Sequence, residues 1–380
     1  MWVLGFVSLL MDLSSEMIHS LLPLYLTVGL GASALVVGII EGVAEASALV
    51  MKVFSGVLSD RWRNRKWLTA AGYGLAALSK PLFPLAASPA MVFTARFADR
   101  IAKGIRGAPR DALIADLTPP SIRGAAFGLR QALDTVGAIA GPLVAVGLMI
   151  LWHDDYRAVF WVAVIPAVLC VVLVVFGVEE PVRHSRAGGK PEKGTRYLFP
   201  RGLAPKFWVV VAAASALTLA RFSEAFLILR AADLGVEAAY APLVLAGMSV
   251  VYAATAYPAG RLADRVPARN LLAAGIAALV AADIALALAP DVVTLAVGVA
   301  LWGLHMGLTQ GLLGAMVAHT APVDLRGTAF GVFNLAMGVA MLAASAIAGA
   351  LWHYVGPAAT FWTGAALAAA SLAITRLARA

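Results

Sequence analysis

The chain has 380 residues, a mean hydropathy of +0.87 and only 13% charged residues. Soluble domains contain about 25% charged residues, so this composition excludes a soluble globular protein. The net charge of +8 would suit a nucleic-acid-binding protein, but the placement of the basic residues, described below, points to a topological signal instead.

Twelve apolar segments, each long enough to cross a bilayer, follow one another along the chain. Their apolar residues run continuously and do not alternate with polar ones, which excludes a β-barrel and predicts helices. The sequence therefore predicts an all-α polytopic membrane protein with twelve transmembrane helices. The predicted spans are 3–28, 33–58, 66–86, 89–117, 122–152, 156–178, 207–230, 237–262, 270–289, 291–319, 327–352 and 356–376.

The first span differs from a cleaved secretory signal. It lacks a basic leader and a small-residue cleavage site, and it carries Asp12, Glu16 and His19. We therefore expect it to be a helix of the mature protein. Cys170 is the single cysteine, which excludes an intrachain disulfide and a cysteine-rich metal site.

Basic residues gather in alternate loops. The loops 29–33, 87–90, 290–291 and 353–357 contain no Lys or Arg. By the positive-inside rule, this asymmetry predicts a multi-pass protein of the cell (inner) membrane with both termini in the cytoplasm. Outside 179–206, the basic residues that carry this signal are Arg61, Arg63, Arg65, Lys66, Arg123, Arg261, Arg265, Arg269, Arg326, Arg376 and Arg379.

The chain also repeats itself. "GVLSDRWRNRKWL" at 56–68 matches "GRLADRVPARNLL" at 260–272, and "RGAAFG" at 123–128 matches "RGTAFG" at 326–331. The two offsets, 204 and 203 residues, indicate an internal duplication. We predict two parallel six-helix halves, 1–178 and 207–380, joined by a polar cytoplasmic linker at 179–206.

Three motifs resemble those of the major facilitator superfamily. Its loop between helices two and three is similar to Gly56, Leu58, Ser59, Asp60, Arg61, Arg65 and Lys66, with Arg63 where the family has glycine. Its fourth-helix pattern resembles Arg100, Lys103 and Gly104, and its fifth-helix pattern resembles Gly137, Gly141 and Pro142. The resemblance covers essentially the whole chain, and it implies the fold of that superfamily and a role in transport.

The loop motif occurs in both halves, and it predicts a gate at the cytoplasmic face. A carboxylate there can cap a neighbouring helix and pair with an arginine, forming a latch that opens when the halves move. The alternative is a solvated turn that only sets topology. The gate residues are Gly56, Asp60, Arg61 and Arg65 in the first half, and Asp264 and Arg265 in the second. Gly137, Gly141 and Pro142 predict close packing of helix five.

The fourth span places its charges on one face, an arc of about 140° at 100° per residue. The repeat offset maps these charged positions onto uncharged residues in the second half, which favours a specific function over a purely structural one. Charge inside a bilayer must face water or a counter-charge. We expect Arg100 and Lys103, with Arg96, to bind the anionic group of a solute. The alternative is a structural network with the acids of other helices.

Acidic residues on the first two spans are candidates for proton coupling. Asp12, Glu16 and His19 share an arc of about 60°, and Glu41 and Glu45 share one of about 40°. Asp99 and Glu224 complete this predicted set. The spacing of Asp12, Glu16 and His19 would also suit a divalent metal or metal chelate, but we predict no resident metal and no cofactor.

Further polar groups on other spans extend the predicted solute site. Arg221 lies on the seventh span, His305 and Gln310 on the tenth, and Gln131 on the fifth. With His19 and the basic residues of the fourth span, these residues form the predicted binding set. The alternative for His305 is a core residue whose hydrogen bonds are made within the protein, with no role in binding a ligand.

The sequence as a whole predicts a proton-coupled secondary transporter for a small polar or anionic solute, acting by alternating access as a monomer in the lipid bilayer. Multidrug or cation efflux is an alternative, and a non-transporting membrane sensor is another. The chain has no phosphate-binding loop for ATP and no hydrolase or metalloprotease motif at a membrane face, so we expect no enzyme activity and no nucleic-acid partner.

Overall fold

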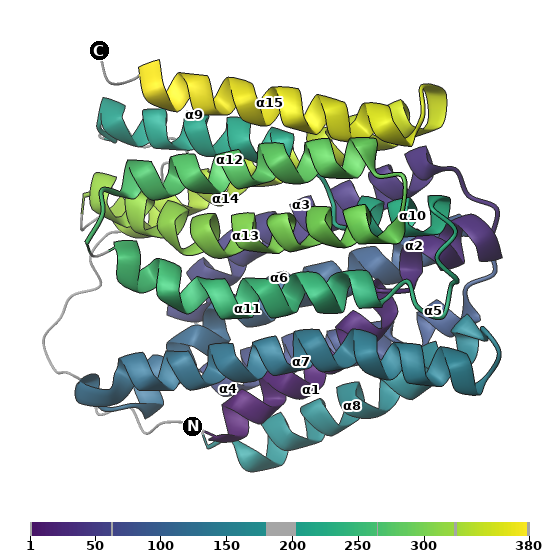
Figure 1. The fold of residues 1–380 in the computed structure, drawn as a ribbon. Coiled ribbons are helices and arrows are strands. Elements are labelled where there is room, and N and C mark those ends of the chain that lie inside the picture. The colour runs from purple at the N-terminus through teal and green to yellow at the C-terminus, as the bar shows by residue number, and fades with distance from the viewer. Residues whose placement is uncertain (1, 62–63, 180–202, 264, 323–324, 378–380) are drawn as a thin grey trace, which may run out of the picture.

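The computed structural model describes residues 2–61, 64–179, 203–263, 265–322 and 325–377, and within these ranges all regular structure is helical (Figure 1). This confirms the predicted all-α fold. The helices of the N-terminal part are α1 (Trp2–His19), α2 (Leu22–Leu24), a π-helix (Tyr25–Gly29), α3 (Ala34–Arg61), α4 (Arg65–Ser79), α5 (Leu82–Leu85), α6 (Pro89–Leu117), a 3-10 turn (Pro120–Ile122), α7 (Arg123–Leu151) and α8 (Tyr156–Gly177). Those of the C-terminal part are α9 (Pro205–Ala220), α10 (Ala225–Asp233), α11 (Leu243–Ala263), α12 (Ala268–Leu288), α13 (Val292–Thr320), α14 (Arg326–Tyr354) and α15 (Pro357–Leu377).

The long helices run side by side between two ends of the molecule (Figure 1). One end holds the start of α1 and the end of α15, and we call it the terminal end. The opposite end carries the short helices α2, α5 and α10. Its turns contain Gly31 and Gly235 with φ of 66° and 84°, a conformation that glycine adopts without strain.

Eight helical segments are long and apolar enough to cross a membrane, among the residues that the structure describes. Four predicted spans are not among these eight, and for two of them, α4 and α6, the structure shows a reason. The helix α4 has 15 residues, and α6 carries the charged stretch that lowers its hydropathy. These helices rely on their neighbours inside the bundle to accommodate their length or charge.

Three of the predicted spans are each divided into shorter helices. The first breaks after His19 and the third after Ser79, and in both cases a proline, Pro23 or Pro81, follows within four residues. Proline lacks the N–H that would continue the helix. The seventh breaks between α9 and α10, where the backbone N–H of Ala225 donates to Ser223 Oγ at 3.2 Å.

The packing groups the helices along the chain. Within the N-terminal part α1 packs against α7 and α8, and α6 packs against α3 and α4; within the C-terminal part α12 packs against α13 and α15, and α11 against α13. The parts are joined mainly by α3 with α14 and α7 with α11, and also by α10 with α2 and α3. The boundaries 1–178, 179–206 and 207–380 stay predictions, and 180–202 lies outside the described residues.

Glycines bring α3 and α14 into backbone contact near the opposite end. A Cβ at Gly38 would lie 2.2 Å from the carbonyl oxygen of Ser345, and a Cβ at Gly349 would lie 2.8 Å from that of Ala34. Both distances are too short for a side chain. At the same end α10 packs against α2, so the two parts of the chain meet closely there.

Candidate functional site

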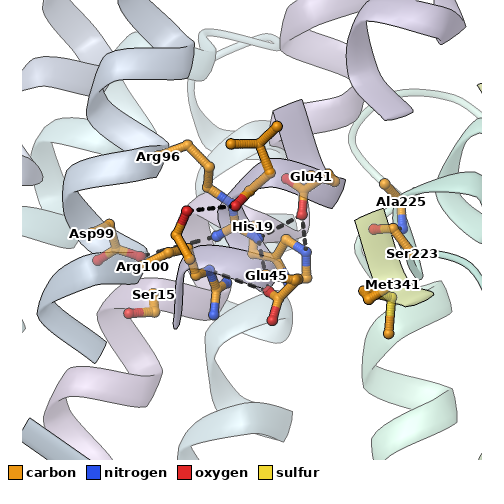
Figure 2. Close-up of polar contacts among 12 residues, drawn as sticks. Ser15, His19, Glu41, Glu45, Arg96, Asp99, Arg100, Ser223, Ala225 and Met341 are labelled. Carbon is orange, nitrogen blue, oxygen red and sulfur yellow. Dashed lines mark hydrogen bonds and ion pairs between the residues drawn. The ribbon is translucent and has the colours of Figure 1, made fainter. Parts of the chain in front are cut away.

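A network of buried charges joins α1, α3, α4 and α6 (Figure 2). At its centre Arg96 Nη2 donates to Glu41 Oε2 at 2.7 Å, and both side chains are 1% exposed. Arg96 also lies 3.8 Å from Glu45 and 4.0 Å from Asp99. Arg96 is therefore paired with protein carboxylates and does not face open space.

His19 lies between two carboxylates. Its Nδ1 is 3.3 Å from Glu16 Oε2, and its Nε2 is 3.6 Å from Glu41 Oε2. A neutral imidazole has one N–H and one acceptor nitrogen, whereas the imidazolium has two N–H groups. Only the protonated ring therefore carries an N–H on the side of each carboxylate, with a hydrogen bond to Glu16 and a longer ion pair with Glu41.

Lys80 is a member of the network that the sequence analysis did not single out. It lies at the end of α4, where Nζ contacts Asp99 Oδ1 at 2.8 Å and Ser15 Oγ at 2.9 Å. The Lys80 side chain is 1% exposed. A lysine inside the apolar segment 66–86 was the available signal, because such a residue needs a buried partner.

Along α6 the network passes from the buried interior to accessible space. Arg100 Nε lies 3.3 Å from Glu45 Oε1, and the Glu45 side chain is 31% exposed. One turn further, Lys103 is exposed and within electrostatic range of Asp12 and Glu45. Lys103 forms no hydrogen bond or ion pair with another described residue. Its charge is thus available to a solute.

The break between α9 and α10 brings charges from the C-terminal part to this region. Arg221 ends α9 and Glu224 precedes α10. Glu224 lies within electrostatic range of His19, Arg221 and Glu45. Figure 2 shows Ser223 of the break on the side of the network that faces the C-terminal helices. Charged groups of both parts therefore share one region at the middle of the bundle.

A cavity of about 110 Å³ lies between α1, α7 and α11, beside this region. It is lined by Asp12, Gln131, Asp134, Thr135, Ala138, Ser249 and Tyr252. The Arg130 guanidinium donates hydrogen bonds to Asp134 Oδ2 at 2.5 Å and to Gln131 Oε1 at 2.8 Å. Two carboxylates and four neutral polar groups thus face a space that both parts of the chain enclose.

The structure separates some residues that share a predicted role. Asp12 lines the cavity, whereas Glu16 and His19 belong to the ionic network. Among the residues described, no group of three or more His, Cys, Asp or Glu side chains is arranged to hold a metal ion. His305 is fully buried and its Nδ1 donates to the Gly275 carbonyl at 2.8 Å, while Gln310 is exposed.

The predicted gate is described only in part. Asp264 and the side chains of Asp60 and Arg61 lie outside the described residues. Arg65 joins the start of α4 to the end of α6 through Asp116 at 2.6 Å. A Cβ at Gly56 would lie 3.8 Å from Ala108, and Arg265 is exposed in a turn.

The fifth-helix glycines lie against α1. A Cβ at Gly137 would be 2.7 Å from the Leu9 carbonyl oxygen, and one at Gly141 would be 2.9 Å from that of Leu13. Pro142 lies inside α7, which continues to Leu151. These contacts place α1, with its ionisable residues, directly against α7.

Comparison with known proteins gives consistent results over the whole length. Residues 4–229 and 209–379 match the family profile described as Major Facilitator Superfamily. An MFS-type transporter of Methanocaldococcus jannaschii is 30% identical over 375 residues, which cover 97% of this chain and 92% of the relative. The multidrug resistance protein MdtH of Photorhabdus laumondii is 29% identical over 160 residues, 42% of this chain and 39% of that protein.

Solved structures share the fold. The nucleoside transporter NupG matches with a TM-score of 0.77 and 15% identity, covering 99% of this chain and 97% of that one. A bacterial homolog of the human lysosomal transporter Spinster, in an inward-facing and occupied conformation, matches with a TM-score of 0.76 and 16% identity, covering 100% and 96%.

Proposed function

The chain belongs to the major facilitator superfamily, and from this premise we propose that it is a proton-coupled secondary transporter that moves a small polar or anionic solute by alternating access. The family assignment favours a transporter over a membrane enzyme or a sensor. The distribution of Lys and Arg supports a cell (inner) membrane location with the terminal end in the cytoplasm, and we expect a monomer.

The observation that carries the solute class is that two cations in the middle of the bundle have no hydrogen-bond or ion-pair partner among the described residues. Lys103 comes from α6 and Arg221 from the end of α9, and both lie within electrostatic range of Glu45. Neither forms an ion pair or hydrogen bond with another residue in the described ranges. An anionic group of a small solute would supply the missing partner.

Proton coupling is proposed for His19 and its two carboxylates. Loss of the proton would leave one ring nitrogen without a hydrogen to donate, so that either Glu16 or Glu41 would lose its contact. The Glu16 side chain is 21% exposed, which offers the proton a route to accessible space. Because Glu224 lies within range of His19, a change of charge there acts on the C-terminal part as well.

Alternating access is supported by the way the two parts meet. The contacts of α3 with α14 and of α2 with α10 hold the opposite end together. Further along the bundle, the side chains of Lys103 and Gln131 are accessible. Rocking about the α7–α11 contact would separate one end as it closes the other. The solute would then reach its site from either face in turn.

The test is solute-driven proton movement in proteoliposomes that contain a pH-sensitive dye. Organic anions, metal chelates and lipophilic cations are added one at a time. We expect an organic anion to drive proton movement, and we expect Lys103→Gln or Arg221→Gln to raise its half-saturating concentration about 10- to 100-fold, as loss of a charged hydrogen bond predicts. Arg269→Gln, on the exposed surface of α12, is the matched control.

The same assay tests the coupling residue. His19→Gln is expected to keep exchange of labelled solute across the membrane but to lose accumulation against a gradient, because the solute site remains while the proton site is removed. Unchanged affinity in both cation variants would contradict the solute class, and gradient-driven accumulation in His19→Gln would contradict the role of the histidine.

Cation efflux is a second candidate, and the cavity favours it. Its lining includes Asp12, and Asp134 paired with Arg130, but no basic residue; the Asp12 carboxylate would suit a cationic solute, and the MdtH relative is described as a multidrug resistance protein. If lipophilic cations drive proton movement, if Asp12→Asn abolishes it and if Lys103→Gln does not, efflux replaces the anion proposal.

A further inference from the structure

Among the residues that the structure describes, the carboxyl group of Asp283 is buried in the C-terminal part without a hydrogen-bond or ion-pair partner. Asp283 on α12 is 0% exposed, and neither of its oxygens has a hydrogen-bond partner. A buried carboxylate without a counter-charge or donor is strongly unfavourable. Its presence in the middle of a helix therefore requires an explanation.

The helices packed against α12 bring no charge to Asp283. On α15 there is no charged residue between Pro357 and Ile374, and on α13 His305 turns to Gly275, two turns away along α12. From α10, Arg230 binds Asp233 and the carbonyl oxygens of Leu286 and Ala289, one turn towards the opposite end. From α11, Tyr252 faces the cavity beside α1 and α7.

The internal repeat shows what is missing. With the offset of 203, Asp283 corresponds to Lys80, and Trp302 corresponds to Asp99. In the N-terminal part these positions form an ion pair of 2.8 Å. In the C-terminal part Trp302 is fully buried, and its Nε1 has no hydrogen-bond partner either. The pairing that neutralises the carboxylate in one part is therefore replaced in the other by two polar groups without partners.

The Asp283 carboxyl is closely packed. A Cβ at Gly364 would lie 2.6 Å from Asp283 Oδ2 and 3.1 Å from the Phe222 ring. The cavity next to this packing is lined by Gly364 and Phe222, with Thr360 and Thr363, and not by Asp283 itself, and its volume is about 10 Å³. One water needs about 10–15 Å³ by the same measure, so the cavity admits no organic solute.

We propose that Asp283 binds a proton in this conformation and exchanges it when the two parts of the chain move. The exchange step rests on the proposed alternating access, whereas the bound proton does not. Phe222 of the α9–α10 break and the Asp283 carboxyl lie against the same residue of α15, Gly364, and the same break places Glu224 near the N-terminal network. A movement of the break would therefore change the packing beside the carboxyl and let it exchange its proton. The C-terminal part would thus hold a proton site separate from His19.

Infrared spectroscopy of the full-length protein in lipid nanodiscs at neutral pH tests the bound proton without any solute. We expect a carboxylic-acid C=O stretching band in the wild type that is lost in Asp283→Asn, a neutral change of the same shape. Asp291→Asn is the matched control, because Asp291 is exposed. Gly364→Ala is a second variant, in which a methyl group beside Oδ2 shifts the frequency of the band without removing the carboxyl.

Exchange is tested by transfer to D2O. The band of a carboxyl that meets solvent shifts as deuterium replaces the proton. We expect the shift in the wild type, and we expect it to be faster in Gly38→Leu, which prevents the close contact of α3 with α14.

Three results would overturn the proposal. They are a spectrum that Asp283→Asn and Gly364→Ala leave unchanged, a band that does not shift in the folded protein, and equal exchange rates in the wild type and Gly38→Leu. Since no solute is added, a negative solute-flux assay would contradict the proposed solute transport but not the proton on Asp283. A negative infrared result would contradict the proton on Asp283 but not the solute transport.

Discussion

The ion pair between Arg96 and Glu41 gives the sharpest prediction on stability, because its two members differ in their other partners. After Arg96→Met, Glu41 keeps only His19 Nε2 at 3.6 Å. After Glu41→Gln, Arg96 keeps Glu45 at 3.8 Å and Asp99 at 4.0 Å. The first change therefore leaves a buried charge poorly paired, and the second does not.

The expected magnitudes follow from this asymmetry. Arg96→Met should lower the free energy of unfolding by about 3–5 kcal/mol, the cost of a buried charge that loses its partner. Glu41→Gln should lower it by about 1.5–3 kcal/mol, the cost of one charge-assisted hydrogen bond. In the double variant no charge of the pair is left alone, so the combined loss should fall short of the sum by about 0.5–3 kcal/mol.

The assay is reversible unfolding of the purified full-length protein in mixed micelles, titrated with a denaturing detergent and followed by tryptophan fluorescence. Arg269→Met, at an exposed position of α12, is the control and should change the free energy by no more than about 0.5 kcal/mol. A smaller loss for Arg96→Met than for Glu41→Gln, or strictly additive losses, would refute the partner-based reasoning.

Three further predictions concern packing and capping. Gly38→Leu should open the opposite end and raise thiol labelling of cysteines introduced there, whereas Gly74→Leu, which meets nothing within 4 Å, should not; equal labelling would contradict this. Gly137→Ala should destabilise the α1–α7 contact in a thermal melt, while Gly147→Ala, also open, should be neutral or stabilising; equal melting temperatures would contradict this. Hydrogen bonds at the start of α13 hold the pKa of Asp291 below its ordinary 3.8, so its stabilising contribution is present above that pH and lost as the pH falls through the lowered pKa; Asp291→Asn should flatten this acid-range dependence of stability, and an unchanged slope would contradict it.

The fold was largely predictable, because it depends on patterns that can be read directly from the order of the residues. Continuous apolar segments predict the helices, and the repeat predicts two halves. The breaks after His19 and Ser79 were also open to prediction from Pro23 and Pro81. The break at Ser223 has no such signal, because it depends on how α9 and α10 pack against other helices.

The sequence predicts which charged residues belong to the candidate site better than it predicts which of them form ion pairs with one another. Helical geometry puts charges on one face, but it cannot say which carboxylate meets which base, because that depends on the distance and rotation between helices. Asp12 thus shares an arc with Glu16 and His19 and yet faces a separate cavity. Asp283 was missed, although the repeat offset applied to Lys80 leads directly to it.

The glycine contact between α3 and α14 affects how the free energy would change as the two helices separate in the proposed alternating access. Attraction between backbone atoms in direct contact has a very short range, and a gap of about 1 Å forfeits up to half of it. Long side chains would stretch and follow a retreating partner, but the backbone around Gly38 and Gly349 has none to extend. In the proposed alternating access, the attraction at this end of the molecule would therefore be lost over a short distance, and the closed and open forms would be separated by a sharp transition with few intermediate states.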